Sequence, residues 1–283
     1  TLYPAHTNLF AQVDVRIRDF VAELLGIGHE DAQRLQKDYY RDYGTTLRGL
    51  MMEHGISPDA FLEYVHDIDH SPVGEDARLG RAIARLPGRR FIMTNGTRYH
   101  AERVADRLGV HDHFEDIFDI VAADLLPKPH AETYARFHDL HGIDPSRAVM
   151  FEDLSRNLKV PHESGMRTVL VVPEGTREVF REDWELEGRT APHVEYVTDD
   201  LAEGLGAAAD LQEVVALLRE RTTAPADAQL LGEVRVRRDD ARLDEHLAHR
   251  DVELLQQAPD LDDLVRRLAD DDRVGAIVDD DAA

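Results

Sequence analysis

From about residue 76 onward, short apolar runs alternate with longer segments of helical periodicity. Strands that alternate with helices of about 10–15 residues are typical of a parallel sheet covered by helices on both faces. We therefore predict an α/β fold. The expected strands are Arg90–Met93, a strand within Asp116–Ala122, Ala148–Phe151, Thr168–Val172 and His193–Val197. The expected helices are Asp76–Leu86, Tyr99–Leu108, His130–His141 and Leu154–Ser164.

The first quarter of the chain is predicted to be helical. The apolar residues of Asn8–Leu25 are spaced to form one helical face, and Gly26 is a suitable residue to end that helix. Two further helices are expected at Asp31–Tyr43 and Thr46–His54. The pair Ser57-Pro58 then indicates the start of a helix that continues through Asp59–His66.

The alternation weakens after about Gly206. We treat residues 206–283 as a C-terminal α/β extension of uncertain structure. The expected elements are a helix at Leu211–Arg221, a linker at Thr222–Ala228, strands at Glu233–Arg238 and Val274–Val278, and a helix at Leu261–Ala269.

The composition excludes several classes of protein. A formal net charge of −24 repels nucleic-acid phosphates, so a nucleic-acid binder is not expected. No apolar run approaches the ~20 residues that cross a bilayer. The absence of cysteine excludes disulfides and fits a cytoplasmic protein. Lysine occurs only at positions 37, 128 and 159, which fits either a salt-adapted surface or a GC-rich genome.

A first group of polar residues follows the expected strand Arg90–Met93. Thr94 can donate its hydroxyl to a phosphate oxygen, and the backbone N–H groups of Asn95 and Gly96 can support it. Glycine at position 96 permits close approach of the backbone. The alternative is that these residues only end the strand and begin a turn.

Lys128 lies between Pro127 and Pro129, which restrict the backbone on both sides and therefore the direction of the amine. An ammonium group in this place can bind phosphate and offset clustered carboxylates. The alternative is a solvated lysine in a surface turn.

Two adjacent acids, Glu152 and Asp153, follow the expected strand Ala148–Phe151. Mg²⁺ prefers oxygen ligands and would relieve the repulsion between two carboxylates. Asn157, one helical turn further on, is placed to orient Asp153. The alternative is that Asp153 caps the helix that follows.

These groups, in this order on alternating strands, resemble the haloacid dehalogenase superfamily of phosphatases. The start, Thr1-Leu2-Tyr3-Pro4, resembles the end of the first motif of its pyrimidine 5′-nucleotidase branch, where Asp-x-Asp-Asn-Thr-Leu-Tyr-Pro is usual. Phe151-Glu152-Asp153 with Asn157-Leu158 and Pro161-His162 is also similar to that branch. The resemblance covers roughly residues 1–205.

The resemblance implies a Rossmann-like core of residues 1–4 and 76–205, with a helical cap at residues 5–75 inserted after the first motif. It implies that Thr94 binds phosphate, that Lys128 steadies nucleophile and phosphate, and that Asp153, helped by Glu152, holds Mg²⁺. An aspartate at the end of the first strand would form an aspartyl-phosphate, and a second one two residues later would transfer protons. The expected substrate is a small phosphorylated metabolite, in this branch a pyrimidine nucleoside 5′-monophosphate.

The chain departs from the family at one place, because both first-motif aspartates are expected before Thr1. One explanation is a truncated sequence. Another is that Ala276–Asp281, an apolar run with an Asp-x-Asp but without a threonine in the expected place, supplies a substitute strand. Three functions stay open: a pyrimidine 5′-nucleotidase, a related phosphatase acting on phosphoglycolate or a sugar phosphate, and a catalytically inactive binding protein.

Overall fold

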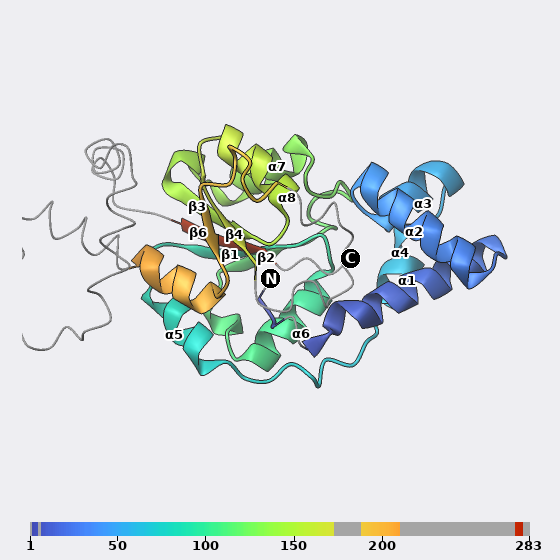
Figure 1. Ribbon diagram of the computed structural model, residues 1–283, viewed down its shortest axis with the longest axis horizontal. Coiled ribbons are helices and arrows are strands. Elements are labelled where there is room, and N and C mark those ends of the chain that lie inside the picture. Colours follow the sequence, from blue (N-terminus) through green and yellow to red (C-terminus); the bar gives the residue numbers. More distant parts are fainter. Residues whose placement is uncertain (1, 5–6, 173–187, 210–274, 280–283) are drawn as a thin grey trace, which may run out of the picture. The chain divides into compact units, whose positions relative to one another are not determined.

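Six parallel strands form one sheet in the computed structural model, which describes residues 2–4, 7–172, 188–209 and, by backbone, 275–279 (Figure 1). The strands are β1 (Arg90–Met93), β2 (Asp116–Phe118), β3 (Ala148–Glu152), β4 (Arg167–Val171), β5 (Tyr196–Thr198) and β6 (Gly275–Asp279). Their order in the sheet is β2-β1-β6-β3-β4-β5. The predicted α/β class with a parallel sheet is confirmed.

Strand β6 lies inside the sheet, between β1 and β3. Residues 275–279 were expected to belong to a C-terminal extension, and this assignment is wrong for them. Ala276 to Val278 pair with Arg90 to Ile92 on one side, and Gly275 to Val278 pair with Ala148 to Phe151 on the other. The physical reason is that β1 and β3 do not pair with each other, so a third apolar strand must satisfy their facing N–H and C=O groups. The helices and the strand predicted between 211 and 269 lie outside the described residues.

Alternate residues of each strand point to opposite faces of the sheet, and each face has its own core. Phe91 and Met93 pack with the residues of α7 and α8, whereas Ile92 packs with those of α5 and α6. Figure 1 shows the same division, with α7 and α8 on one side of the sheet and α5 and α6 on the other. These helices are α5 (Ala77–Arg85), α6 (Arg98–Leu108), α7 (Ala131–His141) and α8 (Ser155–Glu163). A helical segment at 201–209 packs into the core on the α5 and α6 side.

The N-terminal quarter forms four helices, as predicted, and we refer to them as the helical cap. They are α1 (Leu9–Leu25), α2 (His29–Tyr43), α3 (Thr46–His54) and α4 (Pro58–Val65). Gly26 ends α1 with φ of 63°, a left-handed conformation that glycine adopts without strain. Ser57 precedes α4 as expected, but its side chain makes no capping hydrogen bond to the helix. The apolar faces of the four helices enclose a separate core around Val13, Leu50 and Phe61.

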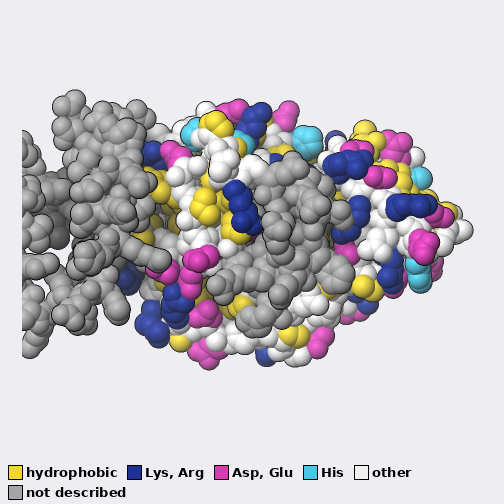
Figure 2. Space-filling model, viewed as in Figure 1, with side chains coloured by type: hydrophobic (Ala, Val, Ile, Leu, Met, Phe, Trp, Pro, Cys, Tyr) yellow, Lys and Arg dark blue, Asp and Glu magenta, His cyan; other side chains and the backbone are white. Residues whose placement is uncertain are grey.

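The surface of the cap helices carries both signs of charge in alternation (Figure 2). Neighbouring residues form ion pairs along α2, for example Arg41 with Asp38 at 3.0 Å. Such exposed pairs contribute little to stability, but they show that this face is not a basic surface for a nucleic acid. In the described part of the chain, no helix combines the length and the apolar character that a membrane span requires.

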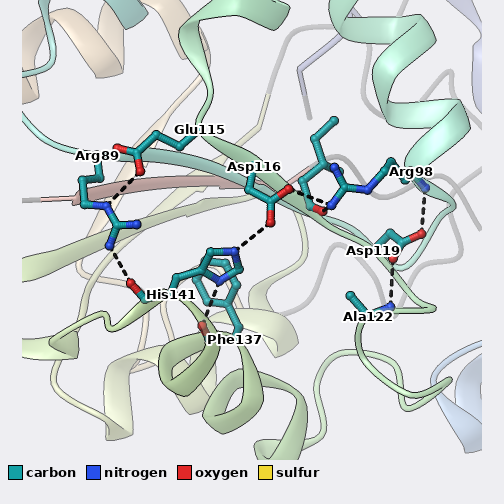
Figure 3. A network of polar contacts seen from close by, with 9 residues as sticks. Arg89, Arg98, Glu115, Asp116, Asp119, Ala122, Phe137 and His141 are labelled. Atoms are coloured by element: carbon teal, nitrogen blue, oxygen red, sulfur yellow. Dashed lines mark hydrogen bonds and ion pairs between the residues drawn. The ribbon is translucent and has the colours of Figure 1, made fainter.

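A polar network ties the edge strand β2 to the helices around it (Figure 3). The carboxylate of Asp116 accepts hydrogen bonds from His141 Nε2 at 3.0 Å and from Arg98 Nη2 at 2.7 Å. The other ring nitrogen of His141 lies 3.0 Å from the carbonyl oxygen of Phe137. His141, the last residue of α7, thus connects this helix to the edge strand β2.

We expect Asp116→Asn to destabilise the protein at neutral pH and to have no effect in acid. Burial alone would raise the pKa of Asp116, but the hydrogen bonds from His141 and Arg98 outweigh burial and lower this pKa below its ordinary value of 3.8. A carboxyl whose pKa is lowered by folding stabilises the native state above the unfolded pKa, and this contribution disappears as the pH falls through the folded pKa. Because the site is partly solvated, we expect a loss of about 1 kcal/mol.

Urea unfolding of the wild type and of Asp116→Asn at neutral pH and at about pH 3 measures this difference. Asp112→Asn, which changes an exposed acid in the neighbouring 3-10 turn His111–His113, is the control and should unfold like the wild type at both pH values. An equal loss for Asp116→Asn at both pH values would show that the effect does not come from ionisation of Asp116.

Candidate active site

The carboxyl ends of β1, β6 and β3 meet at one edge of the sheet. In the strand register, Met93 pairs with Asp279 and Phe151 pairs with Val278. The next residues along the neighbouring strands are Thr94 and Glu152, so two sequence-predicted groups lie on either side of the end of β6. Ligands of open parallel sheets bind at this edge, which is therefore the candidate active site.

Thr94 begins the loop after β1 and is fixed by two hydrogen bonds. Its N–H donates to the carbonyl oxygen of Phe118 at 2.9 Å, and its Oγ1 accepts from the N–H of Gly96 at 2.9 Å. A side chain at position 96 would begin 3.2 Å from Thr94 Oγ1, so any larger residue would have to displace Thr94 by a few tenths of an ångström. Because Oγ1 accepts from Gly96, its proton is oriented away from that N–H and can serve as a donor.

Asn95 connects the loop after β1 to Lys128. Its Oδ1 accepts from the N–H of Lys128 at 2.7 Å, and its Nδ2 donates to the Lys128 carbonyl oxygen at 3.4 Å. We predicted only a backbone role for Asn95. The structure adds a side-chain role, because the amide holds the backbone of the lysine in place.

Lys128 is buried with 0% exposure, so the alternative of a solvated lysine in a surface turn is wrong. Its Nζ donates to the carbonyl oxygen of Met93 at 3.2 Å and lies 3.9 Å from Glu152 Oε1. An ammonium ion is costly to bury unless carboxylates and hydrogen-bond acceptors surround it. The lysine thus brings one positive charge to the ends of β1 and β3.

Glu152, the last residue of β3, is also fully buried. Its Oε2 accepts from the N–H of Asp153 at 2.7 Å, and its Oε1 accepts from the side-chain amide of Asn157. Asn157 thus contacts Glu152, and its expected role in orienting Asp153 stays a prediction. With Lys128 on one side and Asn157 on the other, Glu152 is suited to neutralising the lysine.

Asp153 is 8% exposed and directly follows Glu152. Helix α8 begins at Ser155, and its N-cap position is held by Leu154, which makes no side-chain capping bond. Asp153 therefore does not occupy the N-cap position of α8, and the alternative that Asp153 caps this helix is wrong.

The donors at this edge fit Mg²⁺ in kind. Mg²⁺ is usually bound by one or two carboxylates together with substrate phosphates and water, and Asp153 and Glu152 are oxygen donors of this type. The described side chains contain no group of three or more His, Asp or Glu residues that alone could hold a metal ion.

Sequence reasoning missed two histidines beside the Thr94 loop. A side chain at position 96 would begin 3.4 Å from His66 Nε2 and 3.8 Å from His100 Cδ2. His66 follows the cap helix α4 and His100 lies in the first turn of α6. No local pattern signals this pair, because it forms only when the end of the cap meets α6.

The family of haloacid dehalogenase-like hydrolases matches residues 1–159, which is more than half of the chain. The chain belongs to this family. The matched range includes the cap, the Thr94 loop, Lys128 and the Glu152-Asp153 pair, and it ends well before β6.

This chain is similar to a curated relative, Phosphate metabolism protein 8 of Saccharomyces cerevisiae, with 29% identity over 129 residues. The match covers 41% of this chain and 40% of the yeast protein, so the chain spans less than half of that relative.

Solved structures of similar fold include L-2-haloacid dehalogenase from Xanthobacter autotrophicus, at 15% identity and a TM-score of 0.45 over 75% of this chain and 94% of that one. An HAD phosphatase from Thermococcus onnurineus has 15% identity and a TM-score of 0.46 over 76% and 93% of the two chains. The HAD-hydrolase YfnB of Bacillus subtilis, solved with magnesium, has 13% identity and a TM-score of 0.43 over 71% and 92%.

Proposed function

We propose that this hydrolase is a Mg²⁺-dependent phosphomonoesterase that acts through an aspartyl-phosphate, with pyrimidine nucleoside 5′-monophosphates as its expected substrates. The observation that carries the proposal is the fully buried Lys128, whose Nζ lies between the carbonyl oxygen of Met93 and Glu152 at the edge where Thr94 lies. A buried ammonium bonded to the carbonyl oxygen of Met93, the residue before Thr94, suits the stabilisation of a phosphoryl group, which needs positioning and charge neutralisation above all. The yeast relative's name, Phosphate metabolism protein 8, is consistent with phosphate chemistry.

In this proposal the described residues bind the phosphate, position one another and hold the metal. Thr94 donates its hydroxyl to a non-bridging phosphate oxygen, and the N–H groups of the loop at Asn95 and Gly96 support it. Lys128 offsets the negative charge of the phosphoryl group. Glu152 and Asn157 hold Lys128 and the end of β3 in position, as their contacts with one another suggest. Asp153, with help from Glu152, would hold Mg²⁺, which when bound would offset the charge of the phosphate oxygens.

Asp279 is the residue that we assign as nucleophile. It ends β6, and its backbone pairs with Met93, the residue before Thr94. A carboxylate oxygen of Asp279 would form a bond to phosphorus while the ester P–O bond breaks and the leaving oxygen takes a proton. Water would then cleave the aspartyl-phosphate, which releases inorganic phosphate and regenerates the carboxylate.

The sequence around Asp279 supports this assignment. Residues Asp279, Asp280 and Asp281 follow the apolar run Ala276–Val278 and contain the pattern Asp-x-Asp, whereas Thr1-Leu2-Tyr3-Pro4 resembles the remainder of the same motif. By this resemblance the proton transfers belong to Asp281, which lies outside the described residues.

The test is phosphate release by the full chain with MgCl₂ from a panel of nucleoside monophosphates, phosphoglycolate and sugar phosphates. We expect hydrolysis that is fastest with pyrimidine nucleoside 5′-monophosphates and that stops when EDTA removes the metal. Equal rates on all esters would contradict the nucleotidase assignment. No release from any ester by the folded protein would favour the inactive binding protein. A cytoplasmic location remains a prediction from the composition.

A further inference from the structure

A cavity of about 300 Å³ lies between helix α6 and residues 66–76, the segment that leads from the cap helix α4 to α5. Small-molecule sites in proteins have volumes of about 300–1,000 Å³, so the size of this cavity suits a small ligand. None of its lining residues is among those that we assign to the active site. The lining residues are Ile68, His70, Tyr99, Arg103, Asp106 and Arg107.

One face of α6 supplies most of the polar lining. Tyr99, Arg103 and Arg107 are spaced four residues apart, and residues at this spacing are neighbours on the surface of a helix. All three residues are exposed. The guanidinium carbon of Arg103 lies 5.2 Å from the centre of the Tyr99 ring, a cation–π contact that holds the positive charge in place without neutralising it.

Arg107 connects this face of α6 to the segment opposite. Its Nε and Nη2 donate to the carbonyl oxygens of Val73 and Ser71, both at 2.9 Å. A guanidinium has five N–H donors, so further donors remain for a ligand. The two carbonyl groups are neutral, and Arg107 therefore brings a second positive charge to the cavity.

The carboxylates near the cavity have partners of their own. Asp106 lines the cavity, and its Oδ1 lies 2.8 Å from His111 Nδ1. Asp69 accepts from the N–H and the hydroxyl of Ser71, both at 2.8 Å, and these bonds lower the pKa of Asp69 below its ordinary value. Within the described ranges of the chain, Arg103 forms no ion pair. The lining thus has two arginines against one aspartate.

The charges of both arginines act on His70, which lines the same cavity. Burial is the main reason why the pKa of His70 lies below its ordinary value. The bond to the Ile68 backbone and the charge of Asp69 oppose this effect, whereas Arg103 and Arg107 lower the pKa further. His70 is therefore neutral at neutral pH, and the positive charge in the lining comes from the arginines.

A buried ring separates the cavity from the Thr94 loop. His70 Nε2 lies 3.0 Å from Nδ1 of His100, and His100 is fully buried. On the side of the loop, Cδ2 of His100 lies 3.8 Å from the position that a Cβ atom would take at Gly96. An anion in the cavity and a phosphate at Thr94 would thus occupy two different places.

We infer that this cavity is a second anion site, which binds the phosphate group of a small phosphorylated molecule between Arg103 and Arg107. Guanidinium groups bind phosphate through paired N–H donors in a fixed planar arrangement. A phosphate monoester carries close to two negative charges at neutral pH, which two arginines match, whereas a carboxylate carries one. The inference does not depend on the proposed function, because the two sites share no residue.

The test follows phosphate binding at Arg103 itself, by NMR of the ¹⁵N-labelled full chain in EDTA. The Nε–H resonance of Arg103 is assigned by its absence from Arg103→Gln. Titration with sodium phosphate at constant ionic strength should shift this resonance to saturation, and sodium acetate should require a higher concentration. Arg103→Gln should weaken phosphate binding about tenfold, as measured by the backbone N–H of Arg107, because a charged donor is lost. Arg103→Lys, which keeps the charge without the planar donors, should lose less.

The matched control is Arg81→Gln. Arg81 is an exposed arginine on α5 that does not line the cavity. The control removes the same charge from the chain and should leave the midpoint of the phosphate titration at Arg103 unchanged. Thermal melts on each variant establish that the titrated protein is folded.

A further titration separates the cavity from the active site. In the double variant Lys128→Met/Glu152→Gln the active-site cation is absent, and Arg103 should still respond to phosphate with the midpoint of the wild type. Loss of this response in the folded double variant would show that Arg103 senses phosphate at the active site, and it would overturn the second site.

Three other results would also overturn the second site: no saturable shift in the wild type, equal midpoints for phosphate and acetate, or unchanged phosphate binding in folded Arg103→Gln. The proposed function fails by a different result. Absence of phosphate release from every ester, with the Arg103 response intact, would overturn the hydrolase assignment and leave the second anion site standing.

Discussion

Asp279→Asn should abolish phosphatase activity, with a loss of about 10⁴-fold in kcat, because an amide cannot form the aspartyl-phosphate. The expectation follows from the place of β6 between β1 and β3, which brings the backbone of Asp279 next to Met93. The substitution keeps the length of the side chain, so the strand and the stability of the sheet should be preserved. Steady-state phosphate release and a thermal melt on the same preparation measure both effects.

Asp199→Asn is the matched control, because Asp199 is an exposed acid that follows the edge strand β5. It should retain the activity of the wild type. Full activity in Asp279→Asn would remove the proposed nucleophile and with it the role of β6 in catalysis. A second arrangement of the chain gives an independent check: residues 274–283 moved to a position directly before Thr1 should preserve activity if β6 and the cap belong to one motif.

The second large effect is expected from Lys128→Met. The methionine is close in length but uncharged, so Glu152 would remain buried opposite an apolar group. Removal of one partner from a buried ion pair typically costs about 3–5 kcal/mol, and we expect a loss of this size in the free energy of unfolding. Activity should fall by at least about 100-fold, since the positive charge at the phosphate is lost.

A double variant separates the loss of stability from the loss of activity. In Lys128→Met/Glu152→Gln both charges are absent, and the glutamine can still accept from Asn157 through its carbonyl oxygen. We expect urea unfolding to show that the double variant recovers most of the lost stability, while phosphate release stays as low as in the single variant. If Lys128→Met unfolds like the wild type, the Lys128–Glu152 contact is not a coupled buried pair.

The sequence permitted a correct prediction of strands β1, β3 and β4 and of the helices between them. Each of these strands is a run of apolar residues bounded by polar ones, and each helix has a regular apolar face, so local patterns were sufficient. Strand β5 was predicted at His193–Val197 and begins at Tyr196. Its exposed residues Tyr196 and Val197 give a weak pattern, as is usual for a strand at the edge of a sheet.

The residues Thr94, Lys128 and Glu152 could be found from the sequence because each stands at or beyond the end of an apolar run. Their contacts could not be predicted. Lys128 approaches Glu152 to 3.9 Å, Asn95 bonds to the backbone of Lys128, and Asn157 bonds to Glu152. These contacts join residues that are separated along the chain, or they depend on the direction of a side chain.

By its own pattern, the sequence determined a parallel α/β core with a helical cap and polar groups after its strands, because hydrophobic periodicity and turn residues act over short distances. Only the tertiary structure decided that Gly275–Asp279 fills the gap between β1 and β3 and that His66 and His100 meet at Gly96. Strand order and side-chain convergence depend on which surfaces remain unpaired after the chain has folded back on itself. That information is spread over the whole chain, and no local segment contains it.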